Sequence, residues 1–372
     1  MTIKGLSIIK RVINKVDPTM ARIFMPWIIK HPKTIPTMLR LAKAYKKSRR
    51  IRNEELFKNE LKVPPFLIIS ITSRCNLKCT GCYAAATGTV CESNKGKSLK
   101  IEQWKKIIEE STELGVFGFV IAGGEPFVVQ DLLDLSQEFK DRLFIIFTNG
   151  TILDEQKLEK LKRLKNTIVV VSIEGDQYLT DLRRGNGVYD KALEAIKQLD
   201  ETGIINGVSV TITRKNLHYW MNPENIDHLI DEGVRIGFIL EYIPVNNDIE
   251  LMLTNEESKE FRKQILNYRE TKNIFLVHSP GDEEYMGGCV SAGRGFAHIN
   301  PSGDLTPCPV SDLATHNLTK STLREGLKSP LFEVIRKSEH LLETDDSPCA
   351  LFSHPNEVNE LAKKVKAYKT SA

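Results

Sequence analysis

The chain has 372 residues, of which 41% are hydrophobic and 27% are charged, so its composition is that of a globular protein longer than one ordinary domain. No segment reaches the roughly 18 uninterrupted apolar residues of a membrane span, and the N-terminus lacks the apolar block and cleavage site of a secretory signal. We therefore expect a cytoplasmic protein, in which seven cysteines favour metal ligation over disulfides.

Residues 1–62 are predicted to form a basic helical extension. They hold sixteen Lys and Arg against four Asp and Glu, whereas the remainder holds 36 against 44. An apolar stripe at helical spacing begins at Ile3, and a second helix is expected from Thr37 to about Leu61. Two interpretations stay open: peripheral contact with an anionic membrane surface, or a helical cap over the bottom of the next domain. No nucleic-acid-binding module is present, so no nucleic-acid partner is expected.

From Val63 the pattern changes to strands alternating with helices, which indicates a parallel α/β fold. The predicted strands are Phe66–Ile71, Phe117–Ile121, Phe144–Phe147, Ile168–Ser172, Val208–Thr213 and Gly237–Tyr242. The predicted helices between them are Lys100–Leu114, Leu132–Lys140, Asp154–Leu164, Tyr189–Glu201 and Pro223–Glu232. Six such units predict a partial (β/α)6 barrel over residues 63–247, with ligand-binding residues in the loops at the carboxyl ends of the strands.

Three cysteines, Cys75, Cys79 and Cys82, follow the first predicted strand at the spacing C-x3-C-x2-C. Each iron of a cubic [4Fe–4S] cluster takes one ligand besides its sulfides, so three thiolates leave one iron open. Gly81 allows a tight turn between the second and third cysteines. The alternative is a structural zinc site with Cys91 as the fourth thiolate.

The cysteine loop resembles that of the radical S-adenosylmethionine (radical SAM) superfamily. The resemblance implies a [4Fe–4S] cluster whose open iron binds SAM and whose electron cleaves SAM to a 5′-deoxyadenosyl radical. That radical then abstracts a hydrogen atom from a substrate. The resemblance also implies a reducing partner such as a ferredoxin or flavodoxin. The alternative from a different class is a non-enzymatic iron–sulfur electron carrier, which would not need the glycine-rich loop of residues 123–126.

That loop and the later strand ends carry residues that resemble the family's SAM contacts. Gly123, Gly124, Glu125 and Pro126 follow the second strand, where the glycines permit close backbone approach and Glu125 can anchor the turn. The resemblance implies that this loop contacts the methionine amino group. It further implies ribose contacts from Ser172 and Glu174, a carboxylate contact from Arg184 in preference to Arg183, and an adenine contact from Tyr83.

Two of these assignments have structural alternatives. Glu174 can instead be a buried carboxylate held by backbone amides, and Tyr83 can simply be a packing residue. Thr148-Asn149-Gly150, after the third strand, is another element found in this family, although an ordinary turn would use the same residues.

A second cysteine group lies in the C-terminal part of the chain. Cys289 and Cys308 flank a predicted β-hairpin that turns at Pro301-Ser302-Gly303, with the spacing C-x13-G-x4-C, and Cys349 follows. This run resembles the opening of the auxiliary-cluster domains called SPASM and twitch. The resemblance implies a second, auxiliary [4Fe–4S] cluster held by these three cysteines in a small C-terminal α+β domain, residues 248–372.

The fourth ligand of that cluster is left open by the sequence. Substrate, water or a side chain such as Asp312 or His316 could fill the position, and the three cysteines could instead be buried small hydrophobic residues. Cys91 stays unassigned. A final helix is expected from Asn356 to Lys369.

The sequence therefore predicts a radical SAM enzyme with an auxiliary cluster. The substrate is expected to be a peptide, as for a maturase, or a membrane-associated small molecule or lipid. No catalytic side chain can be assigned from the sequence.

Overall fold

The computed structural model describes residues 17–90, 98–245, 248–343 and 347–370. The apolar stripe predicted to begin at Ile3 and the unassigned Cys91 both lie outside these residues. Among the helices in the described ranges, none is long and apolar enough to cross a membrane.

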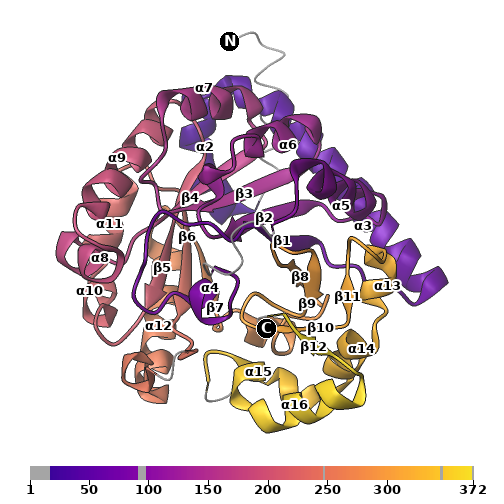
Figure 1. The fold of residues 1–372 in the computed structure, drawn as a ribbon. Coiled ribbons are helices and arrows are strands. Elements are labelled where there is room, and N and C mark those ends of the chain that lie inside the picture. The colour runs from indigo at the N-terminus through magenta and orange to yellow at the C-terminus, as the bar shows by residue number, and fades with distance from the viewer. Residues whose placement is uncertain (1–16, 91–97, 246–247, 344–346, 371–372) are drawn as a thin grey trace.

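A parallel sheet forms the centre of the fold (Figure 1). Its first seven strands are neighbours in chain order, and β8 pairs in parallel with β1 at the opposite edge. Their bounds are β1 Phe66–Thr72, β2 Gly118–Gly123, β3 Leu143–Thr148, β4 Thr167–Ser172, β5 Asn206–Ile212, β6 Ile236–Glu241, β7 Phe275–Ser279 and β8 Phe296–Ile299. The predicted partial barrel is confirmed, but the sequence analysis missed β7, which extends the parallel sheet beyond β6.

Helices surround the strands on the outside (Figure 1). They are α5 Ile101–Glu113, α6 Leu132–Glu138, α7 Glu155–Leu164, α8 Gln177–Arg184, α9 Val188–Glu201, α10 Leu217–Met221, α11 Pro223–Asp231 and α12 Asn255–Thr271. Each long helix turns one apolar face to the sheet. In α5 this face holds Trp104, Ile107 and Ile108, which pack into a core shared with Leu67 and Phe119 of the strands.

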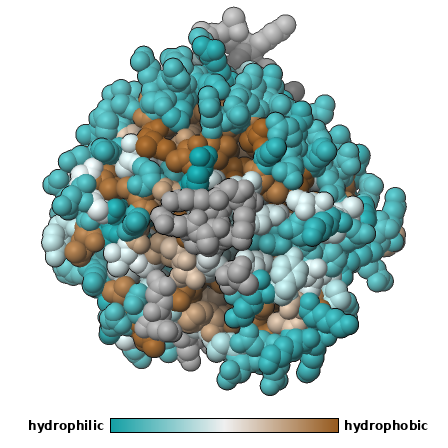
Figure 2. Space-filling model, in the orientation of Figure 1, coloured by the Kyte–Doolittle hydropathy of each residue, from teal (hydrophilic) through white to brown (hydrophobic). Residues whose placement is uncertain are grey.

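Short elements connect these units at several places. They are the single-turn helix α4 Tyr83–Ala86 and the 3₁₀ turns η1 Pro32–Thr34, η3 Pro126–Val128, η4 Ile249–Leu251, η5 Glu283–Met286 and η6 Glu339–Leu342. In the orientation of Figure 1, hydrophobic residues gather in the middle of the visible face, inside a hydrophilic outer ring (Figure 2).

Two N-terminal helices, α2 Pro18–Lys30 and α3 Ile35–Asn59, lie against the bottom of the barrel. Arg22 donates to the backbone carbonyls of Arg269, Glu270 and Lys272, which lead into β7. Arg52 donates to the Gly115 carbonyl, which precedes β2, at 2.6 Å. Because both contacts lie at the amino ends of strands, the structure agrees with the cap interpretation for these two helices. Membrane contact through residues 1–62 stays a prediction.

The C-terminal part continues from β8 into the predicted hairpin, which is confirmed. Strand β9, Asp304–Thr306, pairs antiparallel with β8, and β11, His316–Asn317, extends this edge. Helices α13 Leu323–Leu327, α14 Pro330–Lys337, α15 Ala350–Ser353 and α16 Pro355–Lys364 follow. The final helix was predicted too long: it ends at Lys364, and β12, Tyr368–Lys369, pairs with β10, Leu313–Ala314.

Candidate iron–sulfur and SAM site

The first cysteine loop leaves the carboxyl end of β1, as predicted. Cys75 is exposed, whereas Cys79 and Cys82 are half-buried. The three thiols lie within electrostatic range of one another, and the Leu77 amide donates to the Cys75 sulfur. Burial raises the pKa of Cys75 to about 11 and also raises the pKa of Cys79. The loop therefore gathers three thiols, and ionisation of Cys75 and Cys79 is favoured by a nearby positive charge.

Arg183 fastens this loop to helix α8. Its guanidinium donates to the carbonyls of Thr80 and Gly81, at 3.2 and 3.3 Å, and the Thr80 amide donates back to the Arg183 carbonyl at 2.9 Å. Gly81 has a φ of +65°, and a Cβ there would lie 3.2 Å from the ring of Tyr242. Glycine is therefore required both by the turn and by the close approach of that ring.

Glu174 forms a buried ion pair with two arginines. Its Oε1 atom lies 2.5 Å from Arg183 Nη1 and 2.6 Å from Arg184 Nη2, and its side chain is 2% exposed. Its other oxygen accepts from the Thr211 amide at 3.3 Å. The carboxylate is thus held by arginines as well as by a backbone amide, a partner set that the sequence analysis did not anticipate. Ser172 is half-buried at the end of β4. The ribose contacts of Ser172 and Glu174 stay predictions.

Both arginines act on the thiol of Cys79, and Arg184 also lies in range of the Cys82 thiol and of Glu125. Burial alone would lower its pKa, but the negative charges of Glu174 and Cys79 outweigh burial and raise the pKa of Arg184. Arg184 therefore stays charged beside the cysteine loop, a position suited to binding a carboxylate. This geometry supports the preference for Arg184.

The glycine-rich loop passes directly over the backbone of the cysteine loop. The Glu125 amide donates to the Arg74 carbonyl at 2.9 Å, and the Gly124 amide donates to the Thr72 carbonyl at 2.8 Å. A Cβ on Gly124 would lie 2.0 Å from the Arg74 carbonyl oxygen, so no side chain fits there. The two loops that the sequence predicts to meet SAM are therefore in backbone contact.

The side chain of Glu125 holds the glycine-rich loop in place through three hydrogen bonds. It is 1% exposed and accepts from the Phe127 amide at 3.0 Å, the Thr148 hydroxyl at 2.8 Å and the Asn149 amide at 2.8 Å. The Asn149 side chain then donates to Asn76 of the cysteine loop at 2.9 Å. Asn76 was not singled out by the sequence analysis, because an asparagine between two cysteines carries no signal of its own.

Tyr83 and Pro126 occupy the starts of two short elements. Tyr83 is half-buried at the first position of α4, and burial raises its pKa. Pro126 is buried at the first position of η3. Neither position tests the predicted contact with SAM.

The second cysteine group is also brought together. Cys289 and Cys308 are buried and Cys349 is half-buried, and the three thiols lie within electrostatic range of one another. Burial raises the pKa of Cys289 to about 11 and that of Cys349 to about 12. Glu283 acts on both of these thiols and had not been singled out from the sequence.

The two side chains suggested as a fourth ligand have other neighbours. Asp312 lies 3.9 Å from the Lys369 ammonium, and His316 Nδ1 lies 3.0 Å from the Thr315 hydroxyl. Neither belongs to the charges that act on the thiols of the second group. Ligation of the cluster by Asp312 or His316 therefore stays a prediction.

A buried hydrogen-bonded chain connects the strand of the first group to the second group. His298 Nε2 lies 2.8 Å from the Ser70 hydroxyl of β1, and His298 Nδ1 lies 2.8 Å from the Thr306 hydroxyl of β9. Thr306 then donates to the Cys308 carbonyl at 3.1 Å. Cys308 is thus positioned relative to the strand that carries the first cysteine loop.

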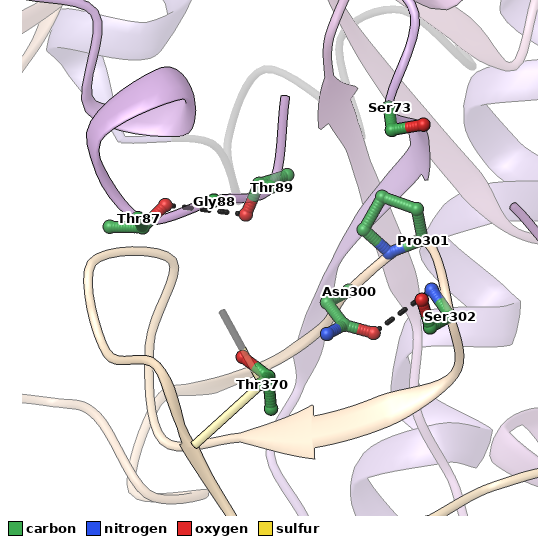
Figure 3. Close-up of a pocket in the computed structure, with 8 residues that line it drawn as sticks. All are labelled: Ser73, Thr87, Gly88, Thr89, Asn300, Pro301, Ser302 and Thr370. Atoms are coloured by element: carbon green, nitrogen blue, oxygen red, sulfur yellow. Dashed lines mark hydrogen bonds between the residues drawn. The ribbon is translucent and has the colours of Figure 1, made fainter. Parts of the chain in front are cut away.

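A polar pocket lies between the segment after the first cysteine loop and the hairpin (Figure 3). It has room for about one water molecule and is bordered by Thr87–Thr89, Ser73, Asn300–Ser302 and Thr370. The Thr87 and Thr89 hydroxyls lie 3.3 Å apart, and the Ser302 amide donates to the Asn300 side chain.

Neither thiol group forms a site for a single metal ion among the residues that the structure describes. In the part of the chain that the structure describes, no three His, Cys, Asp or Glu side chains converge tightly enough to hold one metal ion. In a [4Fe–4S] cluster each thiolate binds a different iron, so the sulfur atoms stand further apart. The alternative zinc site would need Cys91, which lies outside the described residues.

Comparison with known proteins gives a consistent set of relatives. Residues 69–215 match the family described as the Radical SAM superfamily. Fe-coproporphyrin III synthase of Methanosarcina barkeri is 33% identical over 53% of this chain and 49% of its own length. PqqA peptide cyclase of Granulibacter bethesdensis is 26% identical over 68% of this chain and 70% of its own length. The match thus spans about half of the first of these relatives.

A solved structure shares the fold. The crystal structure of Streptococcus suis SuiB bound to S-adenosylmethionine has a TM-score of 0.65, covers 77% of this chain and 71% of that chain, and is 19% identical in sequence. At this identity the likeness concerns the fold alone, and it agrees with a partial barrel of parallel strands.

Proposed function

This chain belongs to the radical SAM superfamily, and we propose that it is a radical SAM enzyme with one auxiliary [4Fe–4S] cluster. The observation that carries the proposal is the meeting of the Cys75, Cys79 and Cys82 thiols with Arg184 and the glycine-rich loop at one end of the barrel. A radical SAM domain favours an enzyme over the alternative of an electron carrier.

Each residue of the site has a role in this proposal. The three thiolates would hold the SAM-binding cluster, and Arg184 would bind the carboxylate of SAM. Gly123 and Gly124 lack side chains that would clash with the cysteine loop. Glu125 fixes the glycine-rich loop to Thr148 at the end of β3. When bound, the cluster and SAM supply a 5′-deoxyadenosyl radical that abstracts a hydrogen atom from the substrate.

The protein's remaining task is to position SAM and keep water from the site. Glu174 is proposed to act indirectly, as a positioning residue that holds Arg183 and Arg184 side by side. Arg183 donates to the backbone of the cysteine loop, and Arg184 lies in range of the thiols. Because Glu174 pairs with both arginines, it would connect the cysteine loop to the guanidinium that binds SAM.

Cys289, Cys308 and Cys349 would hold the auxiliary cluster. Their mutual proximity supports this assignment, since three free thiols gathered in one place suit metal ligation. A cluster there can exchange an electron with the substrate or bind it. We further propose a ferredoxin or flavodoxin as the reducing partner of the enzyme.

We propose a peptide as the substrate. The relative PqqA peptide cyclase, matched over 70% of its length, supports this class. A small-molecule substrate is the second candidate, favoured by the 33% identity to Fe-coproporphyrin III synthase.

Reductive cleavage of SAM tests the enzymatic proposal. The anaerobically reconstituted protein should release 5′-deoxyadenosine when dithionite or reduced flavodoxin is added, as measured by chromatography. Replacing Cys75, Cys79 and Cys82 with Ala should abolish this release. The matched variant that replaces Cys289, Cys308 and Cys349 with Ala should still cleave SAM. Release that persists without the first three cysteines would contradict the proposal.

The substrate class is tested separately. A short peptide encoded beside this gene, added during SAM turnover, should change in mass in the presence of the wild-type protein. The variant lacking the second three cysteines should cleave SAM without changing the mass of the peptide. An unchanged peptide, together with a changed porphyrin substrate, would favour the small-molecule candidate instead.

A further inference from the structure

Glu283 lies at the start of the short loop that leads to the first cysteine of the second group. The 3₁₀ turn η5 begins at Glu283, and the Gly288 amide donates back to the Glu283 carbonyl at 2.9 Å. This bond closes the loop so that Glu283 and Cys289 stand at its two ends. The Glu283 side chain is half-buried and acts electrostatically on the thiols of Cys289 and Cys349.

A close backbone contact joins this loop to η6, which precedes the third cysteine in the chain. The Cys289 amide donates to the Leu342 carbonyl at 2.6 Å, and a Cβ on Gly288 would lie 2.2 Å from that same oxygen. Glycine is therefore required at position 288 for the loop to reach the segment that leads to Cys349. The loop that carries Glu283 is thus held against the end of η6.

The Glu283 carboxylate has no hydrogen bond or ion pair with any residue that the structure describes. Its neighbour Glu284, in contrast, is exposed and paired with Arg262. Arg294 is the cation that acts on Glu283, but its guanidinium donates to the carbonyls of Met286, Gly287 and Cys289. A half-buried carboxylate in this setting lacks the direct partner that burial normally demands.

We propose that Glu283 is the fourth protein ligand of the auxiliary cluster, beside Cys289, Cys308 and Cys349. The inference rests on the proposed function, since it presupposes that these cysteines hold a cluster. Bound to iron, the carboxylate gains the cationic partner that the protein does not give it. It is a harder ligand than a thiolate and marks one iron as different from the other three.

The charge balance is consistent with this set of ligands. Three thiolates and one carboxylate around a cluster core of charge about +2 leave a net charge of about −2. Arg294, which is fixed to the loop backbone by three carbonyls, lies in range of Glu283 and Cys289 and offsets part of this charge. Full ligation by the protein also means that substrate does not bind this iron, so the cluster serves electron transfer.

Spectroscopy of the auxiliary cluster alone tests this assignment. Variants are made in a protein whose Cys75, Cys79 and Cys82 are replaced with Ala, so that one cluster remains. Glu283→Gln keeps the size of the side chain but removes its charge. Glu284→Gln is the matched control one residue away, and Glu283→Cys restores an anionic ligand. Electron paramagnetic resonance is recorded after dithionite reduction and, separately, after mild ferricyanide oxidation.

The proposal predicts that Glu283→Gln changes the spectrum of the reduced cluster. On oxidation this variant should lose its labile iron and give several-fold more [3Fe–4S] signal than the parent. Glu284→Gln should match the parent, and Glu283→Cys should resist loss of iron as the parent does. Identical spectra and identical iron loss in parent and Glu283→Gln would overturn the assignment. A parent that binds no iron would instead overturn the auxiliary cluster itself, so the two failures are distinguishable.

Discussion

Burial of His298 predicts a specific loss of stability in mild acid. The ring is 1% exposed and hydrogen-bonds to the hydroxyls of Ser70 and Thr306, and burial lowers its pKa to about 3. Because Thr306 donates to the Cys308 carbonyl, its oxygen accepts from His298 Nδ1–H, and Nε2 accepts from Ser70. The folded protein therefore holds a neutral ring with both nitrogens satisfied.

Acid destabilises the folded protein because the pKa of His298 is lower in the folded chain than in the unfolded chain. The unfolded chain binds a proton at His298 near pH 6.5, whereas the folded chain does so only near the lowered pKa of about 3. The contribution of His298 to the free energy of unfolding is thus complete above about pH 6.5, and it declines as the pH falls towards 3. Between about pH 7.5 and 5.5 the linkage amounts to about 1.4 kcal/mol of the free energy of unfolding.

Urea unfolding of the wild-type protein and His298→Gln, at both pH values and with the iron content checked, measures this difference. The wild type should lose about 1.4 kcal/mol more than the variant on acidification. His218→Gln, at an exposed histidine, controls for the removal of a histidine as such. Equal losses in wild type and His298→Gln, or a wild type that gains stability in acid, would refute the reasoning.

Two further substitutions test the SAM site. Glu174→Gln leaves Arg183 and Arg184 without their buried carboxylate, so the free energy of unfolding should fall by about 3–5 kcal/mol in urea titrations. SAM binding measured by calorimetry should weaken in the same variant, and unchanged stability would argue against the buried pair. Gly124→Ala places a Cβ against the Arg74 carbonyl and should cost about 1–3 kcal/mol of stability. An alanine variant as stable as the wild type would mean that the loop shifts freely.

The local parts of this structure could be predicted from the sequence. Apolar runs bounded by turn residues predicted β1 to β6, and the spacing of the cysteines predicted which of them lie together. The hairpin of β8 and β9 was predicted from its Pro-Ser-Gly turn. For the strands, the hairpin and the first cysteine group, the signal lies within a few consecutive residues.

Other parts depend on contacts between distant segments. Strand β7 is a five-residue run after a long polar helix, and it is stabilised as a strand by pairing with β6. The final helix ends early because Tyr368–Lys369 pairs with Leu313–Ala314. Nothing in the local sequence specifies either pairing, so local propensity alone missed β7 and predicted a final helix that is too long.

The partners of charged residues were the least predictable from the sequence. Glu174 was expected at a strand end, but its two arginines come from α8 and their approach depends on the folded loop. Glu283 sits in an acidic run that resembles an ordinary surface segment. Only the closed loop between it and Cys289 brings its carboxylate towards the thiols.

The presence of two clusters is tested most directly by counting iron and sulfide in the anaerobically reconstituted protein. We predict about eight irons per chain in the wild type. Replacing either Cys75, Cys79 and Cys82 or Cys289, Cys308 and Cys349 with Ala should reduce this to about four. About four irons in the wild type, unchanged when the second three cysteines are replaced, would contradict the assignment of an auxiliary cluster.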